Sequence, residues 1–322
     1  NRAYSHRFMR TYGTGMQANG WAFAFSVSVI YARQGYIEGT HYDNGSYFFA
    51  AKKKFNDRHS LNLSVMGSAR ERGRSNIFFQ EVYDLTENPY HNTNWGWHVL
   101  SSGDSVRRNA NIAREHVPII TLNHEWKIDE NTSWNTSFLT SFGKRGRERL
   151  NWYDAQDPRP DYYRKLPSYW EGLNDQATAD LWRTRWQNGY TKYTQIDWTG
   201  LYRANDNNLF SQTDADGIAG NTVTGKRAKY IMENQWNNEM SFTLASTFNK
   251  TMENMTITAG LYHQYQRNHV YKTVSDLLGA DFWVDVDQFA EQDFLDPLAA
   301  QNNTAITNNI VRVGDEFGWN YY

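Results

Sequence analysis

Residues 21–32 have the sequence WAFAFSVSVIYA, and this stretch decides the fold class. Its odd-numbered positions carry large apolar side chains from Trp21 to Tyr31, and its even-numbered positions carry Ala or Ser, with Ile30 as the exception. A period of two places successive side chains on opposite faces of an extended chain. We therefore predict a β-strand over residues 20–34 with one apolar face and one polar face.

The same alternation recurs along the chain, for example in SWNTSFLTSF at residues 133–142 and in MSFTLASTF at residues 240–248. Short polar segments bound each stretch, as expected for strands joined by turns. The alternation predicts eight strands, at residues 4–14, 20–34, 41–55, 60–72, 116–128, 132–144, 236–248 and 254–268.

Composition leaves two classes of protein open. The chain has 322 residues, no cysteine, 16% aromatic residues and a formal net charge of −2. No apolar stretch is long enough for a transmembrane helix, the balanced charge argues against nucleic-acid binding, and the lack of cysteine excludes disulfide scaffolds and thiolate sites. The two remaining classes are a secreted carbohydrate-active or carbohydrate-binding protein and a transmembrane β-barrel, in which polar faces mask the apolar ones.

The connections between the predicted strands favour the barrel. Three of them are short polar turns, at residues 56–59, 129–131 and 249–253. Three segments are long loops, at residues 73–115, 145–235 and 269–322. Short and long connections alternate, as in outer-membrane barrels with periplasmic turns and extracellular loops, and a β-sandwich has no reason to separate its loops in this way. The predicted fold is therefore all-β, a segment of a transmembrane antiparallel β-barrel whose long extracellular loops contain short helices.

The alternation also assigns side chains to faces. The side chains expected to face lipid are Phe23, Phe25, Val27, Phe138, Phe242 and Leu244. The charged side chains expected to face the lumen are Arg33, Lys52, Lys54 and Arg70, which could contact an internal domain or a substrate, or could simply be solvated. Rings near the predicted strand ends, such as Trp134 and Phe142, fit an aromatic girdle at the membrane interfaces, with ordinary strand aromatics as the alternative.

The strand count places both ends of the chain on the loop side. If the short turns are periplasmic, the first strand begins outside the cell, and the residues after the eighth strand lie outside as well. We therefore expect residues 1–322 to form part of one transmembrane β-barrel domain, without a plug domain or closing strands.

The long loops hold the candidate ligand-binding side chains. An aromatic cup with a few polar groups suits the capture of a small ligand, although loop rings also pack against their own neighbours. The aromatic candidates for substrate binding are Tyr90, Trp95, Trp97, Tyr162, Tyr163 and Trp170. Asp214 and Asp216 resemble the start of a calcium loop, but the later ligands are missing, so they are only weak metal candidates. The favoured alternative is that they form a solvated turn.

No catalytic signature is present. The sequence has no H-x-x-x-H spacing, G-x-S-x-G elbow, phosphate-binding loop or dinucleotide fingerprint. A carboxylate pair for glycoside hydrolysis needs only proximity in space, so the sequence leaves that chemistry undecided. We expect a protein that is not an enzyme and has no cofactor.

Residues 12–75, with the core GWAFAFSVSVIYARQGYIEGTHYDNGSYFFAAKKKF, resemble the barrel of TonB-dependent outer-membrane receptors of Bacteroidetes-type bacteria. The resemblance continues in NPYHNTNWGW at residues 88–97, through residues 114–170, and in KTVSDLLGADFWVDVDQFAEQDF at residues 272–294. It covers nearly the whole chain, and it rests on the sequence patterns of strands and loops and not on a catalytic signature. It is nearer to the general receptor type than to glycan importers with a lipoprotein lid.

This resemblance implies a barrel of about 22 strands that is plugged by an N-terminal domain and imports a nutrient with energy supplied through TonB. The implied partners are outer-membrane lipid, TonB through a plug that this chain does not contain, and a surface lipoprotein or other outer-membrane subunits, with no nucleic acid. A barrel scaffold in a multiprotein outer-membrane complex is the alternative function, and a secreted carbohydrate-active protein is the third.

Overall fold

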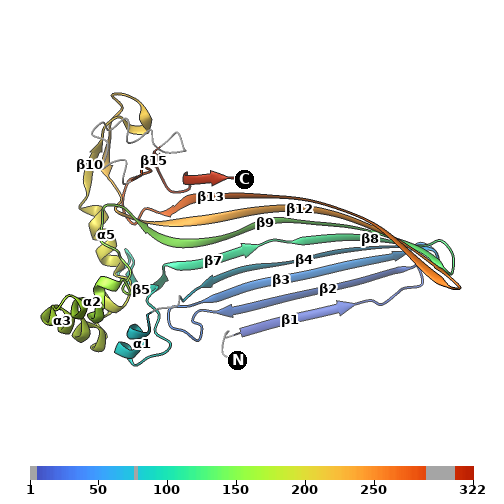
Figure 1. Cartoon of the computed structure of the whole chain (residues 1–322), viewed down its shortest axis with the longest axis horizontal. Coiled ribbons are helices and arrows are strands. Elements are labelled where there is room, and N and C mark those ends of the chain that lie inside the picture. The colour runs from blue at the N-terminus through green and yellow to red at the C-terminus, as the bar shows by residue number, and fades with distance from the viewer. Residues whose placement is uncertain (1–5, 76–78, 288–308) are drawn as a thin grey trace.

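The computed structural model describes residues 6–75, 79–287 and 309–322. In these residues an antiparallel sheet of ten strands runs along the length of the molecule (Figure 1). The strands are β1 (His6–Gly13), β2 (Trp21–Ala32), β3 (Tyr42–Lys54), β4 (His59–Gly73), β7 (Asn111–His116), β8 (Ile119–Lys127), β9 (Thr132–Trp152), β12 (Tyr230–Met252), β13 (Met255–Asp276) and β16 (Glu316–Tyr321). Their order is β1-β2-β3-β4-β7-β9-β12-β13-β16, and β8 pairs with β4 and β9. The predicted antiparallel all-β fold class is confirmed.

All eight predicted strands are present, but the last three are longer than predicted. β9, β12 and β13 have 21, 23 and 22 residues, whereas about 9–11 residues suffice for a tilted strand to cross a bilayer. Their extra length lies mainly at the loop end, so much of what was predicted as loop is strand. At the other end β12 continues to Met252, inside the predicted connection 249–253, and a turn at residues 253–254 joins it to β13.

The predicted strand 116–128 corresponds to β8, and β7 is a separate strand before it, almost entirely within the segment predicted as a loop. Val117 and Pro118 separate the two strands. Proline has no backbone N–H to give to the ladder, so the strand is interrupted there. Gly143 lies opposite the break, and a Cβ atom on it would lie 2.1 Å from the carbonyl oxygen of His116. The pairing register is the same on both sides of the break, so the two faces of the sheet continue through it.

β16 is a strand that the sequence analysis assigned to the loop at 269–322. It pairs with the loop end of β13, with Thr273 opposite Glu316 and Val270 opposite Tyr321. Its sequence EFGWNY alternates Phe317, Trp319 and Tyr321 with Gly318 and Asn320, but it has only six residues and contains a glycine with positive φ, and its pairing with β13 has a register shift. Part of the same segment, residues 288–308, lies outside the described residues.

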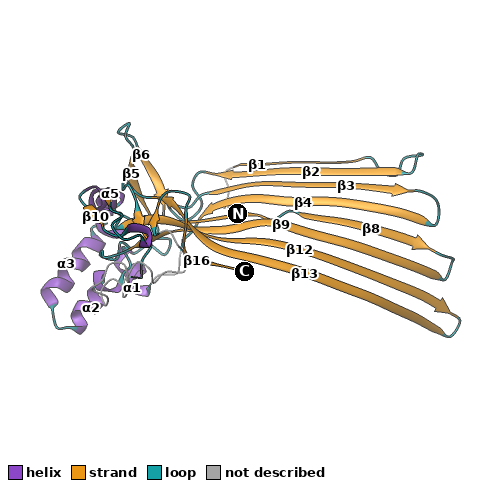
Figure 2. Cartoon of the chain, turned by 90° about the horizontal axis from the view of Figure 1, so that it is seen from above, coloured by secondary structure: helices purple, strands orange, loops and turns teal. Residues whose placement is uncertain are grey.

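The smaller elements gather at one end of the sheet, and the short turns gather at the other (Figure 2). The helices at the loop end are α1 (Gln80–Thr86), α2 (Pro167–Gly172), α3 (Gln176–Gln187), α4 (Thr191–Thr194) and α5 (Trp198–Asp206), with short 3-10 turns at Tyr163–Lys165 and Ala215–Gly217. The strands there are β5 (Trp95–Val99), β6 (Ser105–Asn109), β10 (Leu209–Gln212), β11 (Val223–Lys226), β14 (Trp283–Val284) and β15 (Ile310–Val311). Among the described residues, no helix is both long and apolar enough to cross a lipid bilayer.

The buried core lies at the loop end, where the long strands continue beyond the rest of the sheet. Tyr230 and Met232 of β12 pack with Trp198 and Leu201 of α5. Ile231, between them in sequence, belongs to a second cluster with residues of β13, β14, β15 and β16. Because neighbouring residues of a strand point to opposite faces, this part of the sheet is covered on both sides. The central part of the sheet has no such cover in the described residues.

Candidate functional site

One face of the central sheet is apolar. Directly paired residues share a face, and a row across the sheet joins Tyr12, Phe25, Phe49, Val65 and Ile120. The six side chains predicted to face lipid all lie on this face, and each is between 37% and 43% exposed. Exposed large apolar side chains in a continuous sheet face need another apolar medium, because soluble proteins rarely show such a patch.

Aromatic rings concentrate on the apolar face at the turn end. Trp126 stacks on Trp134 with centroids 6.0 Å apart, and Trp134 contacts Phe248 at 6.2 Å. His59 stacks on Trp126 at 5.4 Å, which extends the row to β4. This aromatic row crosses four strands at the same position along their length. Such a row is the arrangement expected where a barrel wall meets a membrane interface.

The opposite face is polar, and its hydroxyl groups are hydrogen-bonded across strands. Ser141 and Ser241 have their Oγ atoms 2.9 Å apart, and the Oγ of Ser64 lies 2.5 Å from Oγ1 of Thr121. Phe48, Met66 and Leu139 are apolar exceptions. Polar groups on such a face can remain in contact with water, whereas their transfer into lipid would cost free energy.

Three of the four charged residues predicted for the lumen lie on the polar face. Lys52 pairs with Glu125 at 3.0 Å, Lys54 pairs with Asp57 at 2.6 Å, and Arg70 pairs with Glu115. Arg33 does not follow the prediction. It comes directly after β2, and its Nε donates to the hydroxyl of Tyr31 at 2.8 Å, so it lies beside a ring of the apolar face.

The aromatic candidates of the loops form three groups and not one cup. Tyr90 contacts Tyr36 edge-on at 4.5 Å. Trp95 contacts Trp97 at 5.7 Å, and Arg107 lies over both rings. The prediction for Trp95 is wrong, because its side chain is only 2% exposed and lies against the backbone of Gly39, where a Cβ atom would be 2.0 Å from the ring. A tight core position of this kind cannot bind substrate.

The third group is a chain of rings at the start of the helical loop. Tyr162 contacts Tyr163 at 4.6 Å, Tyr163 contacts Tyr169 at 5.0 Å, and Tyr169 contacts Trp170 at 5.2 Å. Hydrogen bonds from Tyr162 and from Arg164 lower the pKa of Tyr163. This group brings together three of the predicted ligand-binding residues, Tyr162, Tyr163 and Trp170.

Asp214 and Asp216 accept hydrogen bonds from backbone groups. The carboxylate of Asp214 accepts from the N–H of Gly220, in its own loop, at 2.7 Å, and that of Asp216 accepts from the N–H of Ile310 at 2.9 Å. The second bond ties the loop to β15. No group of three or more His, Asp or Glu side chains in the described part of the chain could hold a metal ion.

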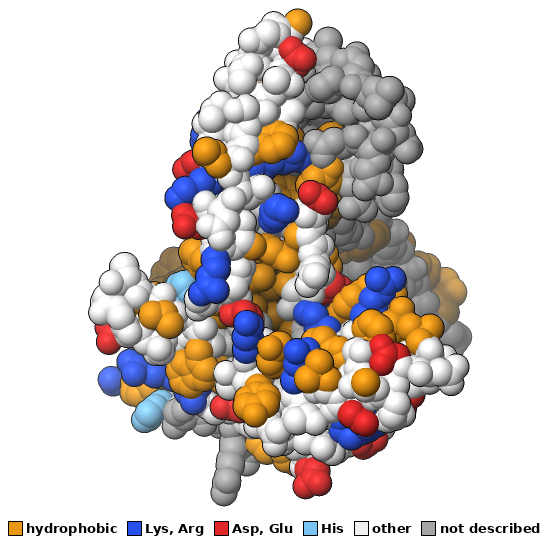
Figure 3. Space-filling view, turned by 90° about the vertical axis from the view of Figure 1, so that its left-hand side faces the viewer, with side chains coloured by type: hydrophobic (Ala, Val, Ile, Leu, Met, Phe, Trp, Pro, Cys, Tyr) orange, Lys and Arg blue, Asp and Glu red, His pale blue; other side chains and the backbone are white. Residues whose placement is uncertain are grey.

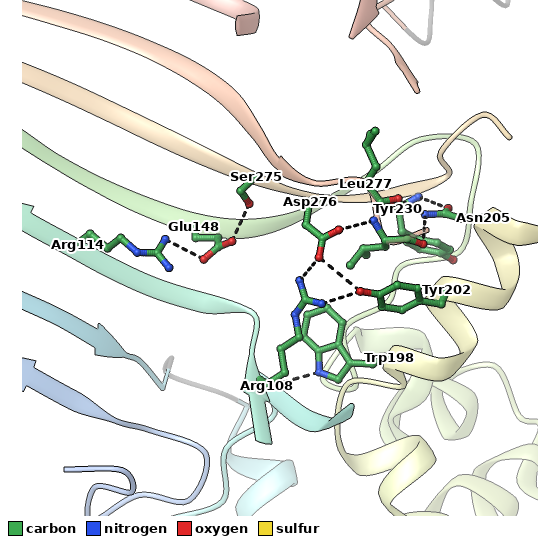
Figure 4. Close-up of polar contacts among 11 residues, drawn as sticks. Arg108, Arg114, Glu148, Trp198, Tyr202, Asn205, Tyr230, Ser275, Asp276 and Leu277 are labelled. Atoms are coloured by element: carbon green, nitrogen blue, oxygen red, sulfur yellow. Dashed lines mark hydrogen bonds and ion pairs between the residues drawn. The ribbon is translucent and has the colours of Figure 1, made fainter. Parts of the chain in front are cut away.

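Hydrogen bonds and ion pairs fix the loops to the long strands (Figure 4). Arg108 of β6 pairs with Asp276 at the end of β13 at 2.6 Å and donates to the hydroxyl of Tyr202 at 3.0 Å. Its guanidinium also lies 4.4 Å from the ring of Trp198. Further along the sheet, Arg114 pairs with Glu148 at 2.9 Å. The loops are therefore set rigidly on the sheet.

A hollow lined by arginines lies on the polar face at the loop end. β4 contributes Arg70 and Arg72, with Arg74 directly after it, and β9 contributes Arg145 and Arg147. We call this the arginine hollow. It has a volume of about 340 Å³, and Ala113, Val270 and Trp319 also line it. Figure 3 views the molecule from the loop end, where basic side chains lie between the loops.

The sequence contained a signal for this hollow. Arg70, Arg72 and Arg74 form an R-x-R-x-R segment, and Arg145, Arg147 and Arg149 form a second one. A period of two puts all three side chains of each segment on one face of a strand. Of these six, only Arg70 was predicted as a site residue, because the search for alternation followed apolar side chains.

Comparisons with known proteins give a limited result. No protein-family model matches the chain, and the search of curated proteins gave no match either. Among solved structures, the chain is similar to the ferripyoverdine receptor of the outer membrane of Pseudomonas aeruginosa, with 6% identity and a TM-score of 0.40 over 84% of this chain and 26% of that chain. It is also similar to the siderophore receptor PiuA from Acinetobacter baumannii, with 8% identity and a TM-score of 0.42 over 83% of this chain and 29% of that chain. The chain spans less than a third of the length of either.

Proposed function

We propose that this chain forms part of the wall of an outer-membrane receptor that imports a nutrient with the help of TonB. The observation that carries the proposal is the two-faced sheet, with exposed rings and aliphatic side chains on one face and hydrogen-bonded hydroxyl groups on the other. In a barrel wall the first face meets lipid and the second meets water.

The arrangement of the connections supports the same proposal. The turns after β3, β8 and β12 are short, and the helices and small strands all lie at the other end of the sheet (Figure 1). In an outer-membrane barrel the long loops face the medium and can meet a nutrient first. The chain of rings around Tyr163, which is itself 41% exposed, belongs to that end and would contribute to capture.

Fractionation of cells that express the full-length protein tests the membrane part of this proposal. We expect the protein in the outer-membrane fraction, and we expect that it leaves that fraction only with detergent. A protein that stays soluble and monomeric without detergent would exclude the barrel and favour the secreted carbohydrate-active alternative.

Uptake measurements test the transport part. Cells with and without the gene, each with TonB intact or deleted, would be grown in media that are each limiting for one nutrient. We expect one medium in which loss of the gene and loss of TonB slow growth to the same extent. Correct membrane insertion with no growth effect in any medium would favour the scaffold alternative.

A further inference from the structure

The arginine hollow is built by two neighbouring columns of arginine on one face of the sheet. Arg70 lies opposite Glu115, which lies opposite Arg145, and Arg72 lies opposite Ala113, which lies opposite Arg147. In each row a residue of β7 separates two arginines. β4 and β9 are two strand spacings apart, about 10 Å, and successive arginines in a column are about 7 Å apart.

The row nearest the loops continues this arrangement. Arg149 lies opposite Asn111 of β7, and the N–H of Arg74 donates to the carbonyl oxygen of Asn111 at 2.8 Å. The side-chain oxygen of Asn111 accepts from Nε of Arg147 at 2.8 Å. Asn111 therefore positions Arg147 and the backbone of Arg74, and as a neutral amide it adds no negative charge beside them.

In the described residues, carboxylates pair with both arginines of the row farthest from the loops. Glu115 pairs with Arg70 and lies 3.6 Å from Arg145, which also pairs with Glu239 at 2.7 Å. In the described residues, neither Arg72, Arg74 nor Arg149 has a carboxylate oxygen within ion-pairing distance.

The other acidic side chain near these rows is already engaged. Glu233 of β12 lies opposite Arg149, but its carboxylate is almost fully buried and pairs with Lys272 at 2.9 Å. It also accepts from Asn151 at 2.8 Å and from Gln235 at 2.7 Å. Its two oxygens are thus committed to neighbours on β9, β12 and β13.

Nε of Arg72 is buried. It is inaccessible to solvent and has no hydrogen-bond partner among the described residues. A buried donor without an acceptor is costly, and like charges held side by side repel each other. An anion in the hollow would relieve the repulsion between the guanidinium groups.

We propose that the arginine hollow binds a small polyanion that carries at least two phosphate or carboxylate groups. Guanidinium groups bind both anions with paired, charge-assisted hydrogen bonds, and several of them within about 10 Å can hold two anionic groups at once. Val270 and Trp319 give the hollow an apolar side, so an organic anion fits it better than a bare inorganic ion. This inference rests on the proposed function in one respect, which is that the polar face borders water.

Calorimetric titration of the full-length protein in detergent tests this proposal. The probes are inorganic pyrophosphate for phosphate chemistry and tricarballylate for carboxylate chemistry, with acetate and glycerol as negative controls. We expect at least one of the two polyanions to bind, and the one that binds more tightly identifies the class of anionic group. Binding should weaken as salt is added, because charge dominates it.

Substitutions then assign the binding to the hollow. Arg72→Gln and Arg74→Gln, both at positions that line the hollow, should each weaken binding about tenfold, the usual effect of removing a charged hydrogen bond. Arg72→Lys should lose less, because it keeps the charge. Arg58→Gln, at the turn end, should bind as the wild type does. Thermal melting of each variant shows whether it is folded.

Two results would overturn the proposal. The first is a folded wild-type protein, purified from the outer membrane, that binds neither polyanion, as it would if an acidic segment of the same protein filled the hollow. The second is equal binding by the wild type and both glutamine variants. Neither result would affect the membrane location, which fractionation tests separately.

Discussion

Arginine at Phe25 or Phe138 should impair assembly of the protein into the membrane, whereas arginine at Ser26 or Ser137 should be tolerated. Phe25 and Phe138 are 41% and 38% exposed on the apolar face, and the serines beside them in sequence lie on the polar face. An arginine that faces the middle of the bilayer costs about 2–4 kcal/mol in outer-membrane barrels. An arginine on the polar face stays in water.

The measurement is folding of each variant into lipid vesicles under denaturant titration, with the amount in the outer membrane as a second readout. Phe25→Ala is the matched control, because it removes the ring without adding charge. Equal losses for the Phe25 and Ser26 variants would contradict the assignment of the two faces.

Asn205→Ala should release the helical loop from the sheet. Asn205 of α5 is fully buried, and its side-chain nitrogen donates to the carbonyl oxygens of Tyr230 at 2.8 Å and of Leu277 at 2.9 Å. Its side-chain oxygen accepts from the backbone N–H groups of Lys229 at 2.8 Å and of Tyr230 at 3.0 Å. Each buried group that loses its partner costs about 1–3 kcal/mol, so we expect a loss of at least about 3 kcal/mol from the loop.

Hydrogen exchange of residues 153–229 would detect this release. We expect faster exchange in α5 and unchanged exchange in the central parts of β2 and β3. Asn207→Ala, two residues further along and exposed, should leave the exchange as it is. If Asn205→Ala leaves α5 protected, the buried amide does not anchor the loop to the sheet.

The central strands could be predicted from the sequence because one face of the sheet is apolar and the other is polar. In β2 every second residue is large and apolar, and the other residues are small or hydroxylated. The parts of β9 and β12 near the loops have no such contrast. The arginines at 145–149 alternate with Gly146 and Glu148, so both faces are polar and the pattern reads as loop.

The loop contacts could not be predicted for a different reason. Trp95 is buried because Gly39 and Ile196, far from it in sequence, close around it. Side-chain type alone does not distinguish such a ring from an exposed one such as Tyr90. Arg33 is an odd-numbered position like the large apolar residues of β2, so the alternation continued past Ala32 agrees with its place beside Tyr31, and its assignment to the lumen did not follow from the pattern.

Labelling of single cysteines in intact cells tests the central claim most directly. The chain has no cysteine, so every label on this chain reports the introduced residue. The loop-end positions are Leu173 and Leu209, which are 56% and 75% exposed, and the turn-end positions are Asp57 and Glu130. With a membrane-impermeant maleimide we expect Leu173→Cys and Leu209→Cys to react in intact cells, and Asp57→Cys and Glu130→Cys to react only after the outer membrane is opened. Reaction at the turns and not at the loops would reverse the orientation, and equal reaction at all four positions would contradict a membrane-spanning wall.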